Sequence, residues 1–345
     1  MKTFLQPLQN LAEMEEIQKQ AKKNCGILEI SGCMESQKAH LMYGLSGLFP
    51  CHLVIAADEK SAKELYEDYR FYDKRVYYYP AKDLLFFQAD IHGNLLIRQR
   101  MQVIRALLER EDEITVVTSI DGCMDYLAPL EKIEKQLIYF RNDSTLDMDK
   151  LTAALVHMGY ERVGQVEMPG QFSIRGGIID IYSLTEENPW RIELWGDEID
   201  SIRSFDAQSQ RSLENLDDVT IYPAAEQPME KNGVSFLDYF KETETLFFLD
   251  ELNHLEENAK AVQEEFQQSC ENRKEKGEIS LSGDWMCTWE ELCHKINDRN
   301  CVAMSLLDPK KSNWKISGQF NITVKSMSSY QSSFELLVKD LKQYK

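Results

Sequence analysis

Short apolar runs alternate with helical segments along the first 128 residues of this 345-residue chain, and this alternation limits the fold more than any other feature. Each run has the length of a buried strand, and each helical segment spaces its apolar residues along one face. This pattern is typical of a parallel sheet covered by helices. We expect strands at 27–30, 53–57, 76–80 and 114–118, and helices at 37–48, 61–69 and 95–110.

The pattern changes between residues 135 and 205. One helix is expected at 149–158, and it ends at Gly159, a favourable left-handed cap. The segments that follow are short, closely spaced and separated by turn residues, which predicts an antiparallel meander. The expected strands are 162–167, 172–175, 178–182, 191–195 and 199–205.

Strand–helix alternation returns after about residue 219, with a strand expected at 245–249, a helix at 255–269 and a charged surface loop at 273–282. The simplest fold is therefore an α/β domain interrupted by an inserted α+β, mostly antiparallel, domain. We place the first half of the α/β domain at 1–128, the insert at 129–218 and the second half at 219–345.

The chain is acidic throughout. It has 58 acidic and 39 basic residues, a formal net charge of −19, and the insert alone has 18 acidic and 9 basic residues. Such a charge repels a phosphate backbone, so we expect little or no direct DNA binding. Composition favours a protein partner.

Several features predict a cytoplasmic protein. Residues 1–23 resemble a polar helix and not a signal peptide, and no apolar stretch approaches the ~18 residues that span a bilayer. The eight cysteines form neither CxxC pairs nor a dense disulfide framework. Their one cluster, Cys287, Cys293, His294 and Cys301, has no standard zinc spacing, so we expect no metal site.

A phosphate-binding loop of the form GxxxxGK followed by Ser or Thr would fall at residues 32–39, between the first strand and its helix. Gly32 and Lys38 match the first glycine and the lysine. Gln37 replaces the glycine that wraps round the β-phosphate, and Ala39 replaces the hydroxyl that ligates magnesium. We therefore predict a degenerate RecA/P-loop-like domain that has no catalytic residues and uses no cofactor.

A second remnant of such ATPases is the apolar run 247–249, which ends in Asp250 and Glu251. In active relatives these acids hold magnesium and position water. A buried strand followed by the acidic start of a helix explains the same residues, and the broken loop favours that interpretation. Arg98 and Arg100 are likewise expected to be solvated charges on their helix.

The insert contains a highly specific sequence segment. Its parts are GYERV at 159–163, PGQFSIRGGIIDIY at 169–182, RIELWGDEIDSIR at 191–203 and SQR at 209–211. The segment resembles the interaction domain that UvrB of the excinuclease ABC system shares with the bacterial transcription-repair coupling factor, where the domain docks the excinuclease protein UvrA. With the flanking halves, the resemblance covers essentially the whole chain.

Two features make the coupling factor the closer relative. UvrB is expected to keep an intact phosphate loop and a long aromatic hairpin that clamps DNA, whereas here the loop is broken and the interval 80–94 is too short for the hairpin. The run 79–87 and the residues 116–118 look like the first subdomain of the coupling factor. The chain thus resembles the amino-terminal, UvrB-like region of this much longer, ATP-dependent translocase.

Period-2 alternation predicts which side chains of the insert face a partner, because apolar residues at 172, 174, 179, 181, 192 and 194 would occupy the core. Exposed arginine, tyrosine and tryptophan are typical of interface hot spots. By resemblance, three arginines of this set match those that dock UvrA. Alternatively, the arginines only pair with acids on neighbouring strands. The predicted partner-binding residues are Arg162, Arg175, Asp180, Tyr182, Arg191, Glu193 and Trp195.

The resemblance implies a non-catalytic adaptor that recruits UvrA of excinuclease ABC to stalled transcription during nucleotide excision repair of DNA damage. It also implies that an intramolecular carboxy-terminal module of the full-length protein covers the same face. The main alternative is an active ATP-dependent DNA repair helicase domain of the UvrB type. A stand-alone DNA-binding protein is a third hypothesis.

Overall fold

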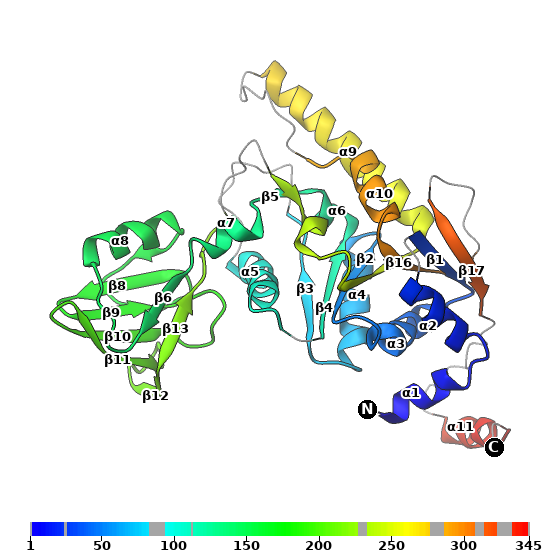
Figure 1. Ribbon diagram of the computed structural model, residues 1–345, viewed down its shortest axis with the longest axis horizontal. Coiled ribbons are helices and arrows are strands. Elements are labelled where there is room, and N and C mark those ends of the chain that lie inside the picture. Colours follow the sequence, from blue (N-terminus) through cyan, green and yellow to red (C-terminus); the bar gives the residue numbers. More distant parts are fainter. Residues whose placement is uncertain are drawn as a thin grey trace.

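The structure consists of a parallel α/β domain and a smaller, mostly antiparallel domain inserted into it, as the sequence predicts (Figure 1). The two parts lie side by side in Figure 1, with the insert on the left. The computed structural model describes residues 2–23, 26–82, 94–111, 113–226, 233–276, 286–307, 314–322 and 333–343.

Seven parallel strands form the central sheet of the α/β domain. The inner strands are buried along almost their whole length, because helices cover both faces. In spatial order the strands are β17 (Ile316–Asn321), β1 (Gly26–Ser31), β16 (Asn300–Ser305), β15 (Thr245–Asp250), β2 (Cys51–Ala56), β4 (Ile114–Ser119) and β3 (Val76–Tyr79).

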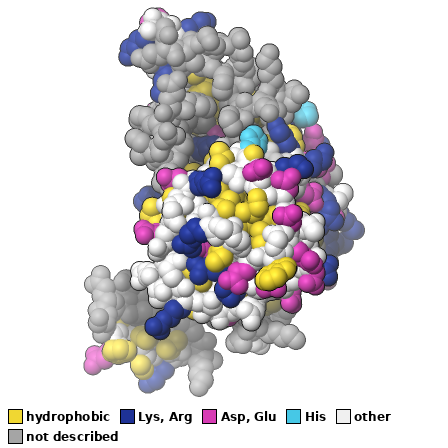
Figure 2. All heavy atoms as spheres, turned by 90° about the vertical axis from the view of Figure 1, so that its left-hand side faces the viewer, with side chains coloured by type: hydrophobic (Ala, Val, Ile, Leu, Met, Phe, Trp, Pro, Cys, Tyr) yellow, Lys and Arg dark blue, Asp and Glu magenta, His cyan; other side chains and the backbone are white. Residues whose placement is uncertain are grey.

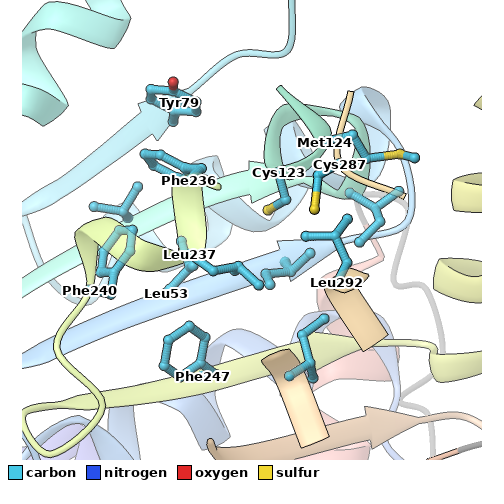
Figure 3. Packing of buried hydrophobic residues seen from close by; sticks show 14 of the residues in the cluster. Leu53, Tyr79, Cys123, Met124, Phe236, Leu237, Phe240, Phe247, Cys287 and Leu292 are labelled. Atoms are coloured by element: carbon cyan, nitrogen blue, oxygen red, sulfur yellow. The ribbon is translucent and has the colours of Figure 1, made fainter. Parts of the chain in front are cut away.

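A separate hydrophobic core lies on each face of this sheet. One face is covered by α1 (Lys2–Gln9), α2 (Met14–Lys23), α3 (Glu35–Ser46) and α4 (Glu59–Arg70). The other is covered by α5 (Asn94–Leu108), α6 (Ile120–Met124), η1 (Phe236–Tyr239), α9 (Leu252–Glu275) and α10 (Trp289–Asn297). Figure 3 shows this second core, where the ring of Phe236 stacks on that of Tyr79 with centroids 3.8 Å apart. The remaining elements of the domain are α7 (Leu130–Glu134), α11 (Phe334–Gln343) and the short pair β5 (Tyr126–Leu127) and β14 (Val234–Ser235).

A six-stranded sheet forms the insert, antiparallel except for its β7–β8 edge. One face packs against α8 (Met148–His157) and the paired strands β6 (Ile138–Arg141) and β13 (Asp218–Ile221). Because β6 and β13 pair, the chain enters and leaves the insert on two adjacent strands. Val219 and Ile221 of β13 belong to the hydrophobic core of the insert. The division at residue 218 stays a prediction. The strands are β12 (Ser212–Leu216), β11 (Glu198–Phe205), β10 (Trp190–Trp195), β9 (Ile178–Ile181), β8 (Gln171–Arg175) and β7 (Glu161–Arg162).

Two predicted segments differ from the structure. The strand expected at 162–167 ends at Arg162, because Gln171 Oε1 accepts hydrogen bonds from the backbone of Glu167 and Met168 and holds a loop there. Helix α9 extends through Glu275 into the predicted loop, with Arg273 and Lys274 at its negative carboxyl end. The rest of that predicted loop lies outside the described residues, as does most of the interval 80–94.

The prediction that Arg100 is a solvated charge is wrong, because this side chain is fully buried. Its Nη2 lies 3.0 Å from Asp125 Oδ2, its Nη1 donates to the Pro80 carbonyl at 2.9 Å, and its Nε bonds Glu226. Lys82 also pairs with Glu226. Burial alone would raise the pKa of Glu226, but Arg100 and Lys82 hold it below the usual value. Two cations and two carboxylates thus neutralise one another inside the protein.

We predict that Arg100→Met lowers the free energy of unfolding by about 3–5 kcal/mol, because it leaves buried carboxylates without their counter-ion. Arg98→Met, on the same helix but half-buried, serves as the matched control and should cost under about 1 kcal/mol. Urea titration followed by circular dichroism measures both. Equal stability of the two variants would contradict the assignment of a structural role to Arg100.

Candidate protein-docking face and degenerate nucleotide site

The residues of the predicted degenerate nucleotide site lie where β1 and β15 end, at the carboxyl edge of the parallel sheet. Lys38, in the first turn of α3, places its Nζ 2.6 Å from Asp250 Oδ1 and 2.7 Å from Glu251 Oε1. The lysine and Asp250 are buried, and Glu251 is largely so. The structure therefore brings together the lysine and the two acids that the sequence pattern singled out, 212 and 213 residues apart.

These contacts neutralise the positive charge of Lys38. Burial would lower its pKa, but Asp250 and Glu251 raise it above the usual value, so the ammonium stays protonated. Glu251 Oε1 also accepts a hydrogen bond from the backbone of Leu306 at 2.9 Å. In an active ATPase the lysine binds phosphate, whereas here it is the counter-ion of two carboxylates of its own chain.

Gly32 has a structural role that differs from cradling a phosphate. Its φ is +80°, and an added Cβ would lie 2.2 Å from the carbonyl oxygen of Ile322. The backbone N–H of Ile322 donates to Ser31 at 2.9 Å. The chain after β17 therefore packs against the loop at Gly32, which requires glycine there. The two replacing residues differ in environment, since Ala39 is buried in the core and Gln37 is half-buried.

A cleft of about 1020 Å³ adjoins this site. Its charged lining comprises seven carboxylates and two lysines, one of which is the neutralised Lys38. Burial, together with Glu64 and Glu35, raises the pKa of Asp68 in this cleft. The negative potential of such a lining opposes binding of a triphosphate.

The predicted docking face is the surface of the insert sheet opposite α8, and the structure corrects one of its members. Asp180 was predicted to be exposed, but it is fully buried beneath two arginines. Arg191 Nε and Nη2 bind its two oxygens at 2.7 and 2.9 Å, and Arg175 Nη2 binds Oδ2. A carboxylate with two positive partners can be buried at low cost, and sequence alternation does not show this.

The other predicted residues of this face differ in accessibility. The Arg175 side chain is 43% exposed and that of Arg191 only 14%. Trp195 is 83% exposed, at the end of β10. Arg162, exposed on β7, does not belong to this face: it pairs in register with the core residue Phe172 and lines a surface hollow with residues of α8, on the other side of the sheet. The hydroxyl of Tyr182 donates to the carbonyl of Glu187 at 2.6 Å.

Sequence reasoning missed three residues that organise this face. Arg203 pairs with the predicted residue Glu193 across β10 and β11. The ring of Phe205 lies 4.4 Å from the guanidinium carbon of Arg191, and Gln210 Oε1 accepts from Arg191 Nη2 at 3.0 Å. The alternation on β11 could have indicated Arg203, but nothing local indicates the roles of Phe205 and Gln210.

Among the described residues, no group of three or more His, Cys, Asp or Glu side chains is arranged to hold a metal ion. Cys287, Cys293 and Cys301 are buried free thiols, and the Cys301 thiol lies 3.3 Å from the Ile296 carbonyl oxygen. In the same part of the chain, no helix has the length and apolarity that a membrane span needs.

Comparison with known proteins identifies the insert. Residues 138–226 match the UvrB interaction domain family. The chain is 39% identical over 222 residues to the transcription-repair-coupling factor of Bacillus subtilis strain 168, a match that covers 59% of this chain and 19% of the relative. The predicted resemblance to the amino-terminal region of a coupling factor is confirmed.

Other coupling factors align with this chain over a shorter stretch. That of Staphylococcus aureus strain MRSA252 is 35% identical over 164 residues, covering 48% of this chain and 14% of the relative. That of Staphylococcus haemolyticus is 35% identical over 162 residues, covering 47% and 14%. The aligned part of the chain thus spans a fifth or less of the length of these coupling factors. The names of these relatives describe proteins that couple transcription to repair.

We predict that the chain neither binds nor hydrolyses ATP, because Lys38 is already paired and the loop lacks its second glycine and its hydroxyl. Calorimetry with magnesium-ATP should show no saturable heat for the wild-type chain, for Lys38→Ala or for the control Lys60→Ala, an exposed lysine of α4. Micromolar binding that Lys38→Ala abolishes and Lys60→Ala preserves would instead establish a working nucleotide site.

Proposed function

We propose that this chain is a non-catalytic adaptor region that recruits UvrA of excinuclease ABC to stalled transcription in nucleotide excision repair. The observation that carries the proposal is the charged face of the interaction-type insert, on which the guanidinium of Arg175 binds Asp180 and is partly exposed. The face combines arginines with an exposed tryptophan, Trp195. Arginine and tryptophan are the residue types that carry most binding energy at protein interfaces.

The surface of the insert is suited to a protein partner. Figure 2 shows the side of the molecule that lies on the left in Figure 1, where hydrophobic side chains gather amid charges of both signs. Tyr139, Val156, Met168, Trp195 and Leu213 are all more than half exposed on this domain. Apolar residues surrounded by polar ones form the usual plan of a protein interface.

The α/β domain lacks features that nucleotide binding requires, and this supports the adaptor role. The pairing of Lys38 with Asp250 and Glu251 and the acidic cleft beside them oppose nucleotide binding, which the helicase alternative requires. We therefore assign this domain the role of a scaffold, and any translocase activity to other modules of a full-length coupling factor. A cytoplasmic location and a carboxy-terminal module that covers the docking face belong to the same proposal.

We predict that Arg175→Ala weakens binding to purified UvrA by about 1–3 kcal/mol, the usual range for hydrogen bonds to charged groups. Lys150→Ala removes an equally positive, 85% exposed side chain from α8, on the other side of the sheet, and should leave binding unchanged. Titration calorimetry measures both, and thermal melting shows that both variants are folded. If the folded Arg175→Ala variant keeps wild-type affinity, Arg175 is not part of the docking surface.

We also predict weak DNA binding, because the net charge of −19 opposes contact with phosphates. A fluorescence titration with labelled duplex at ~150 mM salt should show little binding, since the free-energy gain from counterion release, and with it non-specific affinity, is smaller at this salt concentration. Sub-micromolar affinity under these conditions would favour the DNA-binding hypothesis over the adaptor.

A further inference from the structure

A pocket of about 570 Å³ lies at the amino edge of the parallel sheet, whereas the predicted nucleotide site lies at the carboxyl edge. Its floor contains the first residues of three adjacent strands, Thr245 of β15, Cys51 of β2 and Ile114 of β4, which are paired in register. The volume falls within the range of small-ligand sites in proteins, about 300–1,000 Å³.

The walls of the pocket are largely apolar. They include residues 106–108 from the last turn of α5, Leu130 of α7 and Phe240, which follows η1. The Tyr239 hydroxyl donates a hydrogen bond to the Ala128 carbonyl at 2.5 Å and so ties η1 to the segment before α7. In Figure 1, α5 and α7 lie next to each other between the insert and the sheet. Elements of the scaffold thus hold the walls in place without a ligand.

One buried polar group on the floor lacks a strong hydrogen-bond partner. Thr245 is only 1% exposed, and its hydroxyl has no nitrogen or oxygen to bond among the described residues. The polar group beside it is the thiol of Cys51, a weak hydrogen-bonding group whose pKa burial raises to about 11. Because a buried hydroxyl without a good partner costs free energy, a polar ligand atom at this point would be stabilising.

Part of the charged lining is already neutralised inside the protein. Glu244 pairs with Lys241 at 3.1 Å, and Asp238 pairs with Lys295 at 2.5 Å. Arg299 lies 3.5 Å from Asp238 as well. These carboxylates therefore have cations of their own chain as partners and leave little charge for a ligand.

Two glutamates of α7 keep their charge. Glu131 and Glu134 are exposed, lie three residues apart on one side of the helix, and pair with no cation among the described residues. The other charges that line the pocket are the carboxylate of Glu111 and the guanidinium of Arg110. Lys132, on the same helix as the two glutamates, does not line it. Three carboxylates against one cation make the potential of this rim negative.

We propose that this pocket binds a small amphiphilic organic cation. The apolar body of the ligand packs against α5 and Phe240, its charged nitrogen lies at Glu131 and Glu134, and an acceptor atom takes the hydrogen bond of Thr245. The negative rim disfavours an anion. A purely apolar ligand would leave the Thr245 hydroxyl without a partner. The site goes beyond the adaptor role and does not depend on it.

Three probes that share one apolar body test the proposal by NMR titration of the ¹⁵N-labelled chain. They are phenoxybutylamine, phenoxybutanol and phenoxybutyrate, which are positive, neutral and negative at neutral pH and carry the same ether oxygen. The amine should bind with a Kd of about 1 mM or tighter, as expected for a ligand of this size. It should shift the amide signals of Thr245, Cys51 and Ile114. The alcohol should bind severalfold more weakly than the amine, and the carboxylate more weakly still, because exposed ion pairs contribute modest free energy.

Four results would overturn the proposal. They are no binding of the amine up to about 10 mM, two orders of magnitude below which a specific fragment site is normally half-filled, binding that leaves the floor residues unshifted, an alcohol that binds as tightly as the amine, and a carboxylate that binds tightest. The last two results would identify an apolar pocket and an anion site at Arg110, respectively.

A charge variant tests the role of the rim. The double substitution Glu131→Gln with Glu134→Gln should lower the affinity for the amine to that for the alcohol and leave the affinity for the alcohol unchanged. Glu264→Gln with Glu265→Gln removes the same charge from exposed positions of α9 outside the pocket and should preserve the preference for the amine. All four residues are exposed, so both variants should fold. Wild-type affinity for the amine in the first variant would refute the assigned cation site.

The Thr245 hydroxyl is tested separately. Thr245→Val removes it at nearly constant volume and should weaken all three probes severalfold alike, whereas Thr245→Ser keeps the hydroxyl and should retain binding. Should the valine variant fail to fold in a thermal melt, phenylpentylamine tests the same bond on the wild-type chain, because a methylene replaces its ether oxygen. It should bind more weakly than phenoxybutylamine. Equal affinity in the folded valine variant, or of the two amines, would overturn the hydrogen bond to Thr245.

Discussion

The buried charge cluster around Arg100 is the interaction on which the arrangement of the two parts depends. Arg100 lies on α5 of the scaffold, and Glu226 lies on the segment that returns from the insert, so their bond ties the return segment to the scaffold. The same helix contacts the insert again through Arg105, which pairs with Glu186. Glu109, the residue after the helix, accepts a hydrogen bond from the Tyr222 hydroxyl at 3.0 Å. Because a buried charge needs its counter-ion in a fixed place, these contacts define how the insert is held on the scaffold.

Lys38 and Asp180 are also buried charges, each paired with two side chains of opposite charge, but the two clusters differ in what they leave accessible. At the predicted degenerate nucleotide site, Lys38 pairs with two acids of its own chain, Asp250 and Glu251, so its charge is neutralised inside the α/β domain. On the proposed docking face, Asp180 neutralises only part of the charge of its two arginines, and Arg175 stays accessible. A buried ion pair leaves a side chain able to bind a ligand only if some of its charge stays unneutralised and some of its surface stays exposed.

Much of the fold could be predicted from the sequence, because strand and helix periodicities are local. The observed elements that correspond to the predicted strands 53–57 and 114–118 and the predicted helix 61–69 lie within two residues of the predicted bounds. The errors are of another kind. Arg100 and Asp180 were expected to be exposed, as charged residues usually are, and both are buried. The carboxylates that bind Arg100 lie 25 and 126 residues away along the chain, and a local hydrophobic pattern cannot indicate contacts at such sequence separations.

The sequence by itself determined the order of the elements, the loss of the phosphate loop at Gln37 and Ala39, and the specific segment that relates the insert to an interaction domain. These follow from residue type and spacing, which are local properties. Only the tertiary structure decided that Lys38 is neutralised by Asp250 and Glu251, and that Arg175 is accessible while Arg191 is largely buried. The reason is that the state of a charge depends on its burial and on the counter-charges packed around it, and both come from segments that the fold alone brings together.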